Sequence, residues 1–327
     1  MADLPSALLP LVIDAERLWL GEEVPAGPLL VIDLDATKAW PETLRLPPCP
    51  IVGVGDPSHP LAPSLDAVVE PRVGIATIAA RVAAHPQAAA VTVQLLRLLP
   101  ALADADGLAA ESMAYALLQG SADHRDWMAA NPRISDPAGR VHAVRVGNGL
   151  TLTLDRSQGG NAIDRSMRDA LYAALSLAAL DPAVTRVILR GAGRNFSLGA
   201  DLSEFGTTTD PATAHAIRAR TLPAHAAAAC AAKLEIHVQG ACVGAGLELA
   251  AWAHRITAAP DAWFQLPELA MGVLPGAGGC VSLTRRIGRQ RTALMILSGK
   301  RIDVRQALGW GLIDAIMDAA PSDEGGA

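Results

Sequence analysis

Residues 238–250 read VQGACVGAGLELA. A hydrophobic, strand-like lead-in ends at Gly240, small residues follow at 244–246, and Glu248 then stands between two leucines. Residues without bulky side chains let the backbone approach a ligand closely. A strand that turns into a helix through such residues leaves N–H groups without partners at the helix start, where they favour negative charge. The stretch therefore predicts a strand–turn–helix unit that stabilises an oxygen gaining charge during a reaction, with an acid close by.

Two other stretches have the same character. RGAGRNFSLGADLSEFG (190–206) ends a strand in glycines and then turns through Gly199 and Ala200. FQLPELAMGVLPGAGG (264–279) places Glu268 after a proline and continues into a glycine-rich turn. One N–H from each of the first two stretches would form an oxyanion hole with two donors. Two acids beside it would permit paired acid and base chemistry.

Strands and helices alternate through the second half of the chain. The GNG turn predicts a hairpin over 141–155. Apolar spacing predicts a helix over 164–180 with Asp164 as its N-cap. Strands are expected at 185–191 and 234–240, and strands alternating with helices are typical of an α/β protein.

The first 130 residues are less regular. Strands are expected at 29–35 and 50–56, and helices at 73–86, 90–103 and 107–120. There is a faint internal echo, because SLDAVVE (64–70) resembles LIDAIMD (312–318) in pattern. The early copy has no glycine-rich turn followed by an acid, so it cannot form the same site.

Composition excludes several classes of protein. The chain has 327 residues, enough for about two units. It is 51% hydrophobic and 18% charged, which predicts a folded core rather than disorder. The net charge of −6 argues against a nucleic-acid partner, and no run is long enough to span a membrane.

Four cysteines without a C-x-x-C pair are typical of a reduced, cytoplasmic protein, and the eight histidines are not spaced to bind a metal. The G-A-G at 244–246 does not complete the glycine pattern of a dinucleotide-binding turn, because the third glycine is absent.

FSLGADL, VQGACVGAGLELA and FQLPELAMGVLPGAGG together resemble the three signature segments of the crotonase superfamily, the enoyl-CoA hydratase/isomerase fold. They occur in the family's order and at about its spacing, and the resemblance covers residues 143–317. It implies an α/β fold with a crotonase-like ββα spiral core, to which this chain adds a helical module.

The resemblance implies an enoyl-CoA hydratase. The N–H groups of Ala200 and Ala245 would bind the thioester carbonyl, Glu248 would activate water at C3, and Glu268 would protonate C2. The substrate is an acyl-CoA, whose coenzyme A is part of the substrate rather than a cofactor. The family also implies a homo-oligomer, a trimer or a hexamer. Isomerisation, thioester hydrolysis, C–C cleavage and a non-catalytic acyl-CoA-binding subunit stay open as alternatives.

The same resemblance implies a set of residues that contact the substrate. Ala245 replaces a usual glycine, Gln265 replaces another and is expected to narrow the acyl pocket, and Gly160 replaces a basic residue. For the basic run TRRIGRQR (284–291), both solvent exposure and contact with CoA phosphates stay open. The predicted substrate contacts are Asn161, Ala162, Leu198, Gly199, Asp201, Leu202, Gly244 and Gly276.

One departure from the family concerns the order of its parts. The family places a helical region after the last core strand, whereas this chain ends shortly after Asp318. We therefore expect a fused or permuted arrangement, in which a remnant of a first unit supplies the helices. The expected parts are a degenerate α/β segment (1–64), a helical module resembling the family's C-terminal region (65–131), a linker (132–142), the catalytic core (143–318) and a flexible tail (319–327).

Overall fold

The structure is a computed structural model that describes residues 6–20, 27–40, 44, 46–70, 73–134 and 136–317. The tail predicted at 319–327 lies outside the described residues. The helices are α1 (Ala15–Leu20), α2 (Ile75–Ala84), α3 (Pro86–Leu98), α4 (Asp104–Gln119), α5 (Ala122–Ala130), α6 (Arg165–Leu180), α7 (Pro211–Thr221), α8 (Pro223–Ala229), α9 (Ala245–Ala250), α10 (Gly279–Ile287), α11 (Arg289–Ser298) and α12 (Val304–Trp310).

The larger sheet of the second half has six strands in the order β12-β9-β7-β6-β5-β4. The two strands that come first in the sequence, β4 and β5, form an antiparallel hairpin in which Val146 pairs with Gly149, as the GNG turn predicts. All other neighbours are parallel. The hairpin begins at Arg140, inside the segment expected as a linker. The strands are β4 (Arg140–Val146), β5 (Gly149–Asp155), β6 (Arg186–Gly191), β7 (Leu234–Val238), β9 (Arg255–Ala258) and β12 (Ala315–Ile316).

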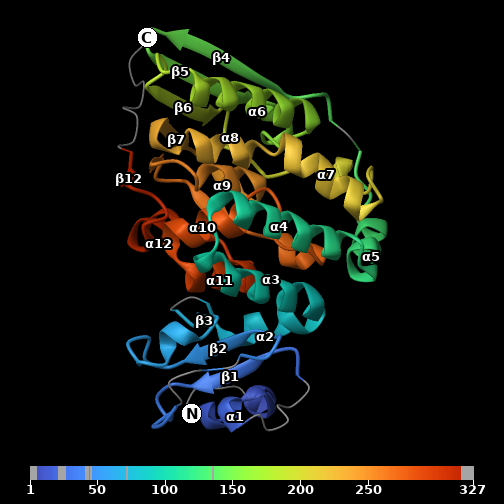
Figure 1. Ribbon diagram of the computed structural model, residues 1–327, viewed down its shortest axis with the longest axis vertical. Coiled ribbons are helices and arrows are strands. Elements are labelled where there is room, and N and C mark those ends of the chain that lie inside the picture. Colours follow the sequence, from blue (N-terminus) through green and yellow to red (C-terminus); the bar gives the residue numbers. More distant parts are fainter. Residues whose placement is uncertain are drawn as a thin grey trace, which may run out of the picture.

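Side-chain patterns explain how this sheet is covered. Along β5 and β7 buried residues alternate with partly exposed ones, which is the pattern of a strand with one face in the core. The predicted helix after the hairpin is confirmed as α6, and the carboxylate of Asp164 accepts the N–H of Met167 at its start. Figure 1 shows α6 and α8 lying over the sheet.

A smaller sheet pairs the three stretches that the sequence analysis singled out. Its strands are β8 (Ala241–Val243), β10 (Trp263–Gln265) and β11 (Ile302–Asp303), in the order β11-β10-β8. Two isolated parallel bridges extend it, one joining Ser197 to Cys242 and one joining Ile163 to Ala200. Segments far apart in the sequence are thereby brought side by side.

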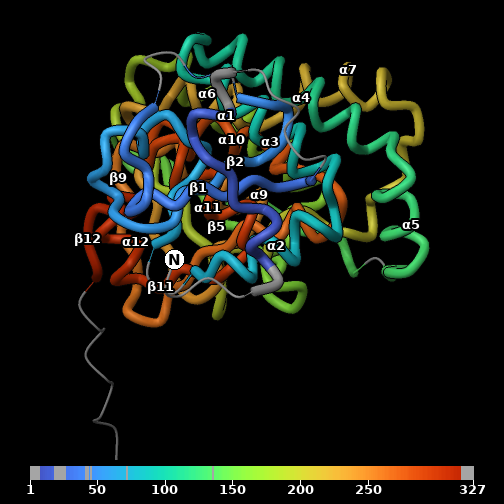
Figure 2. The backbone as a smooth tube through the Cα atoms, turned by 90° about the horizontal axis from the view of Figure 1, so that it is seen from below, coloured from blue at the N-terminus to red at the C-terminus, as the bar shows by residue number. Residues whose placement is uncertain are grey.

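The N-terminal part has its own parallel sheet, formed by β1 (Leu30–Asp33), β2 (Ile51–Val54) and β3 (Ala67–Val68) in that order. Helices α2 and α3 lie next to this sheet on the side that faces the rest of the molecule, and α4 lies farther from it (Figure 1). Seen from below, β1 and β2 lie in front of the rest of the molecule (Figure 2). Helix α11 packs against β3, α2 and α3, and α10 packs against α3 and α4. The two halves of the chain therefore share a core.

Two aspartates anchor the last strands of the N-terminal and six-stranded sheets. The carboxylate of Asp66 accepts the N–H of Ile51 and pairs with Arg97 and Arg289. The carboxylate of Asp314 accepts the N–H of Ile256 and also pairs with an arginine, Arg286. Arg286 and Arg289 of the basic run therefore pair with aspartates of the protein.

Among the described residues, no helix is both long and apolar enough to cross a lipid bilayer.

Candidate functional site

Strand pairing brings the three predicted site stretches together. The bridge between Ser197 and Cys242 aligns the first stretch with the second, and Cys242 also pairs with Phe264 of the third. Each stretch then leaves its strand on the same side and turns. A single cavity of about 280 Å³ lies where the three turns meet.

Ala200 and Ala245 both line this cavity. A Cβ atom on Gly199 would lie 3.6 Å from the amide nitrogen of Ala245, so the two turns are in close contact. Gly199 and Gly244 have positive φ angles of 100° and 48°, which glycine adopts readily. Within the described part of the chain, neither alanine N–H donates to another backbone group. The two turns therefore bring two residues whose N–H groups have no backbone acceptor, within the described part of the chain, to one cavity.

Glu248 lies in α9 and is only 2% exposed. One carboxylate oxygen, Oε2, accepts the N–H groups of Ala277 at 2.6 Å and Gly279 at 2.9 Å. A Cβ on Gly279 would lie 2.3 Å from Cγ of Glu248, so no larger residue fits there. Burial raises the pKa of Glu248 to about 7, although the two N–H groups oppose that rise.

Glu268 faces the same cavity from the short 3-10 helix Glu268–Met271 and is 9% exposed. Its Oε2 is buried and has no hydrogen-bond partner among the described residues. Burial, reinforced by the charge of Glu248, raises the pKa of Glu268 well above its usual range. The cavity thus holds two acids in different settings: Glu248 accepts two backbone N–H groups, whereas Oε2 of Glu268 has no partner among the described residues.

Most of the other predicted substrate contacts also line the cavity. They are Leu198, Gly199, Asp201, Leu202, Gly244 and Gly276. Gln265, expected to narrow the acyl pocket, is not among the described lining residues, and its side-chain amide donates to the carbonyl of Gly299 at 2.7 Å.

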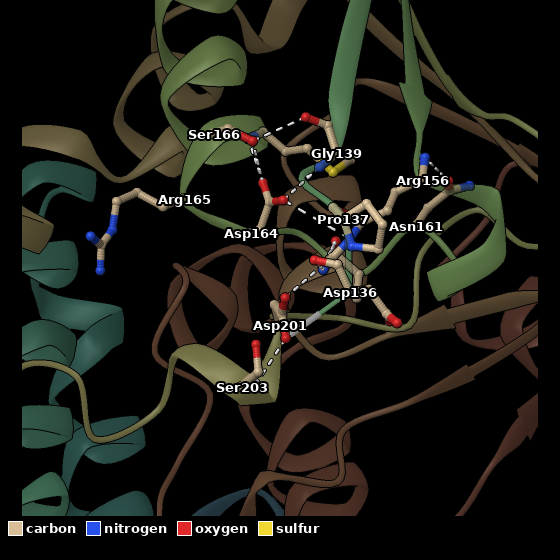
Figure 3. A network of polar contacts seen from close by, with 12 residues as sticks. Asp136, Pro137, Gly139, Arg156, Asn161, Asp164, Arg165, Ser166, Asp201 and Ser203 are labelled. Atoms are coloured by element: carbon tan, nitrogen blue, oxygen red, sulfur yellow. Dashed lines mark hydrogen bonds and ion pairs between the residues drawn. The ribbon is translucent and has the colours of Figure 1, made fainter. Parts of the chain in front are cut away.

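Asn161 and Ala162 are likewise not among the described residues that line the cavity. The Asn161 amide donates to the carbonyls of Ala192 and Asn195, and its oxygen accepts the N–H of Arg156. Asn161 is thus engaged in holding backbone, and Figure 3 shows it beside Arg156. We expected a substrate contact at this loop, whereas the structure shows a buried amide with three backbone partners.

Asp201 lines the cavity but its carboxylate turns to Arg156, with which it forms a 2.7 Å ion pair (Figure 3). It also accepts the N–H of Ser203 and so caps the short turn after Ala200. Hydrogen bonds and the Arg156 charge keep the pKa of Asp201 low despite its partial burial. Arg165 points away from this network and lines the cavity instead.

The sequence did not predict the wall of the cavity formed by α4 and α7. Tyr115 of α4 and Arg218 of α7 both line it, and the Arg218 guanidinium lies 4.7 Å above the tyrosine ring. Arg218 also donates to Ser112 and Gln119 of α4 and so joins the two helices. Burial raises the pKa of Tyr115 and lowers that of Arg218. Within the described residues, no group of three or more acids, histidines or cysteines is arranged to bind a metal ion.

Residues 147–323 match the family model described as enoyl-CoA hydratase/isomerase. The chain belongs to this family. Family membership confirms the resemblance seen in the three signature stretches, and the mixed α/β architecture agrees with the family's solved structures. The matched segment of this family member begins in the β4–β5 hairpin, so α4, with Tyr115, lies before it.

Related proteins of the family share about half of this chain. It is 36% identical over 177 residues to the 2,3-dehydroadipyl-CoA hydratase of Escherichia coli, covering 53% of this chain and 66% of that protein. It is 32% identical over 176 residues to the mevalonyl-coenzyme A hydratase SIDH of Beauveria bassiana, covering 51% and 63%. A crystal structure of an enoyl-CoA hydratase/isomerase from Marinobacter aquaeolei matches with a TM-score of 0.51 and 25% identity, covering 55% and 70%. The chain spans just under two thirds of the length of these curated relatives.

Proposed function

We propose that this family member is an enoyl-CoA hydratase that adds water across the 2,3 double bond of an acyl-CoA. One observation carries the proposal: Ala200, Ala245, Glu248 and Glu268 line the same cavity. Curated relatives named as hydratases of other acyl-CoA esters support it. The proposed reaction needs no cofactor.

The two amides would bind the thioester oxygen. Addition of water at C3 places negative charge on that oxygen, and fixed backbone donors stabilise such charge at little reorganisation cost. Their stabilisation increases as charge develops, so it lowers the barrier rather than only tightening binding.

The two acids would divide the proton transfers. Glu248, with a pKa of about 7, is substantially ionised near neutral pH and is the base that takes a proton from water as the oxygen–C3 bond forms. Glu268, with its pKa raised further by the charge of Glu248, keeps its proton and delivers it to C2. Return of a proton from Glu248 to Glu268 restores the starting state.

An absorbance assay with crotonyl-CoA tests the proposal through loss of the enoyl-thioester band. We expect Glu248→Gln and Glu268→Gln each to lower kcat by about 10²–10⁴-fold while acyl-CoA binding changes little. Glu235→Gln is the matched control, because that acid pairs with Arg186 at the sheet surface, away from the cavity. Near-native turnover in either cavity variant would refute the assigned roles.

Product analysis separates the alternatives. A 3-hydroxyacyl-CoA supports hydration, whereas a shifted double bond, free coenzyme A or a shortened acyl chain would identify isomerisation, thioester hydrolysis or C–C cleavage. Tight binding of acyl-CoA without any turnover would identify a non-catalytic binding subunit.

A further inference from the structure

A third buried acid lies beside the two proposed catalytic glutamates. Glu111 belongs to α4 and is only 1% exposed. Its helix precedes the family-matched residues 147–323, so the family segment alone does not supply this carboxyl. An ionisable group buried this deeply is costly unless it has specific partners.

The partners of Glu111 are backbone N–H groups of the third signature stretch. Its Oε1 accepts the N–H of Gly278 at 2.6 Å, and its Oε2 accepts that of Val281 at 3.3 Å. The N–H groups of Ala277 and Gly279 are held by Glu248. Donors in this short segment thus alternate between two acids that approach from different helices, α4 and α9.

Two glycines permit the close approach of α4 to this segment. A Cβ on Gly107 would lie 3.2 Å from Cγ2 of Val281, tighter than ordinary packing. Gly278 has a φ of 101°, and a Cβ there would lie 3.3 Å from Leu108 of α4. The helix is therefore seated directly on the turn that Glu248 contacts.

We propose that Glu111 is a positioning residue that holds the 277–281 backbone from the α4 side and thereby keeps the Glu248 carboxylate aimed into the cavity. The expected effect on turnover rests on the proposed function, whereas the contacts between Glu111 and the backbone do not. Glu248 accepts two N–H groups of the 277–281 segment, and Glu111 accepts two others. Loss of the bonds to Glu111 should therefore let this backbone move and displace the Glu248 carboxylate.

The charges around Glu111 point the same way. Burial and the charge of Glu248 raise the pKa of Glu111, and the charge of Glu111 helps raise that of Glu268. Of the other groups facing the cluster, Arg218 on α7 is the cation, while burial raises the pKa values of Tyr115 and the Cys280 thiol so that both stay neutral. At pH values where Glu111 is ionised, removing its charge is therefore expected to make Glu268 lose its proton more easily.

Glu111→Gln is the first test variant. Its side chain offers one acceptor oxygen and one NH₂ group, so one of the two backbone N–H groups loses its acceptor. We expect kcat to fall by about 10²-fold with KM nearly unchanged, as for a small misplacement of a reacting group. The alkaline limb of the kcat–pH profile should also move to lower pH.

Two further variants separate charge from position. Glu111→Asp keeps the charge but is too short to reach both N–H groups, so it should lose turnover while its alkaline limb stays near that of the wild type. Asp106→Asn makes the same acid-to-amide change at an exposed position of the same helix and should leave both readouts unchanged.

A pH titration of the carboxyl infrared bands of the unliganded protein distinguishes the two hypotheses. If the wild type turns over no enoyl-CoA, the proposed function fails, yet a shifted carboxyl titration in Glu111→Gln still supports the coupling. Glu111→Gln protein that unfolds cooperatively like the wild type and keeps its titration and kcat would overturn the inference. If that variant does not fold, wild-type kcat in Glu111→Asp would overturn it instead.

Discussion

The same strand arrangement occurs twice in the chain, at β2–β3 and at β9–β12. In each case an aspartate directly precedes a two-residue parallel strand, and its N–H and carboxylate both bond one isoleucine of the neighbouring strand. At β2–β3 these residues are Asp66 and Ile51, and at β9–β12 they are Asp314 and Ile256. The echo between SLDAVVE and LIDAIMD thus reflects one local geometry.

What lies between the paired strands differs. The chain passes from β2 to β3 through residues 55–66, whereas residues 259–314 between β9 and β12 carry Glu268 and α10. Between β7 and β9, α9 carries Glu248. The strand arrangement is therefore shared, whereas the two proposed catalytic acids lie in segments of the second half of the chain, within or just before the later copy. Whether the N-terminal part is a remnant of a first unit stays a prediction.

The largest effect should come from removing the earlier region altogether. Deleting residues 1–130 would expose the faces of α10 and α11 that α2, α3 and β3 cover. We expect no soluble, folded protein, because a large apolar surface would be exposed to water. Soluble expression and circular dichroism measure this. A well-behaved, active 131–327 fragment would show instead that the later region is self-sufficient.

Neutralising the two anchoring aspartates compares the copies directly. Asp66 is 1% exposed and pairs with two arginines, so Asp66→Asn should cost about 3–5 kcal/mol of unfolding free energy. The Asp314 side chain is 42% exposed, so Asp314→Asn should cost about 1 kcal/mol or less. Denaturant unfolding measures both. Equal losses would mean that burial does not distinguish the two anchors.

The buried acid Glu248 should also make the free energy of unfolding depend on pH. Burial raises the pKa of Glu248 from 4.5 to about 7, so the stability contributed by its neutral form is present below about pH 4.5 and lost as pH rises through 7. Glu248→Gln cannot ionise, so its stability relative to the wild type should improve by about 3 kcal/mol across that range. Unfolding curves at several pH values provide the check, and a pH-independent difference would contradict the burial argument.

The smallest expected effect concerns the contact between α4 and the third stretch. A Cβ on Gly276 would lie 2.1 Å from the Tyr115 ring, so Gly276→Ala should cost about 1–3 kcal/mol by overpacking. Gly309→Ala in α12 is the matched control, because its Cβ would meet nothing within 4 Å and should stabilise by up to about 1 kcal/mol. Equal stabilities for the two variants would show that Tyr115 and α4 move aside at little cost in free energy.

The sequence predicted those features that contiguous residues determine. The hairpin, the helix capped by Asp164 and the strand–turn–acid stretches each follow from local chemistry, and Ala200, Ala245, Glu248 and Glu268 line one cavity. The position of Asn161 was not predictable in this way, because its buried contacts come from the chain around Ala192 and Asn195.

The contributions of α4 were missed for a related reason. Glu111 and Tyr115 reach the site only through packing, and Glu111 meets Gly278 across a separation of 167 residues. A signal was nevertheless present. Glu111 stands in the apolar run AAESMAYA, and the cost of burying an acid, which drew attention to Glu248, applies there as well.

The bonds between Glu111 and the 277–281 backbone have a consequence for how the protein is made. During synthesis the N-terminal part leaves the ribosome first, and its helices wait for α10 and α11 before their apolar sides are covered. Contacts between such distant parts of a chain form slowly, because a long loop must close first. The newborn chain therefore brings Glu111 to the site only after residues 277–281 have been made, and chaperone dependence should be greatest just before that.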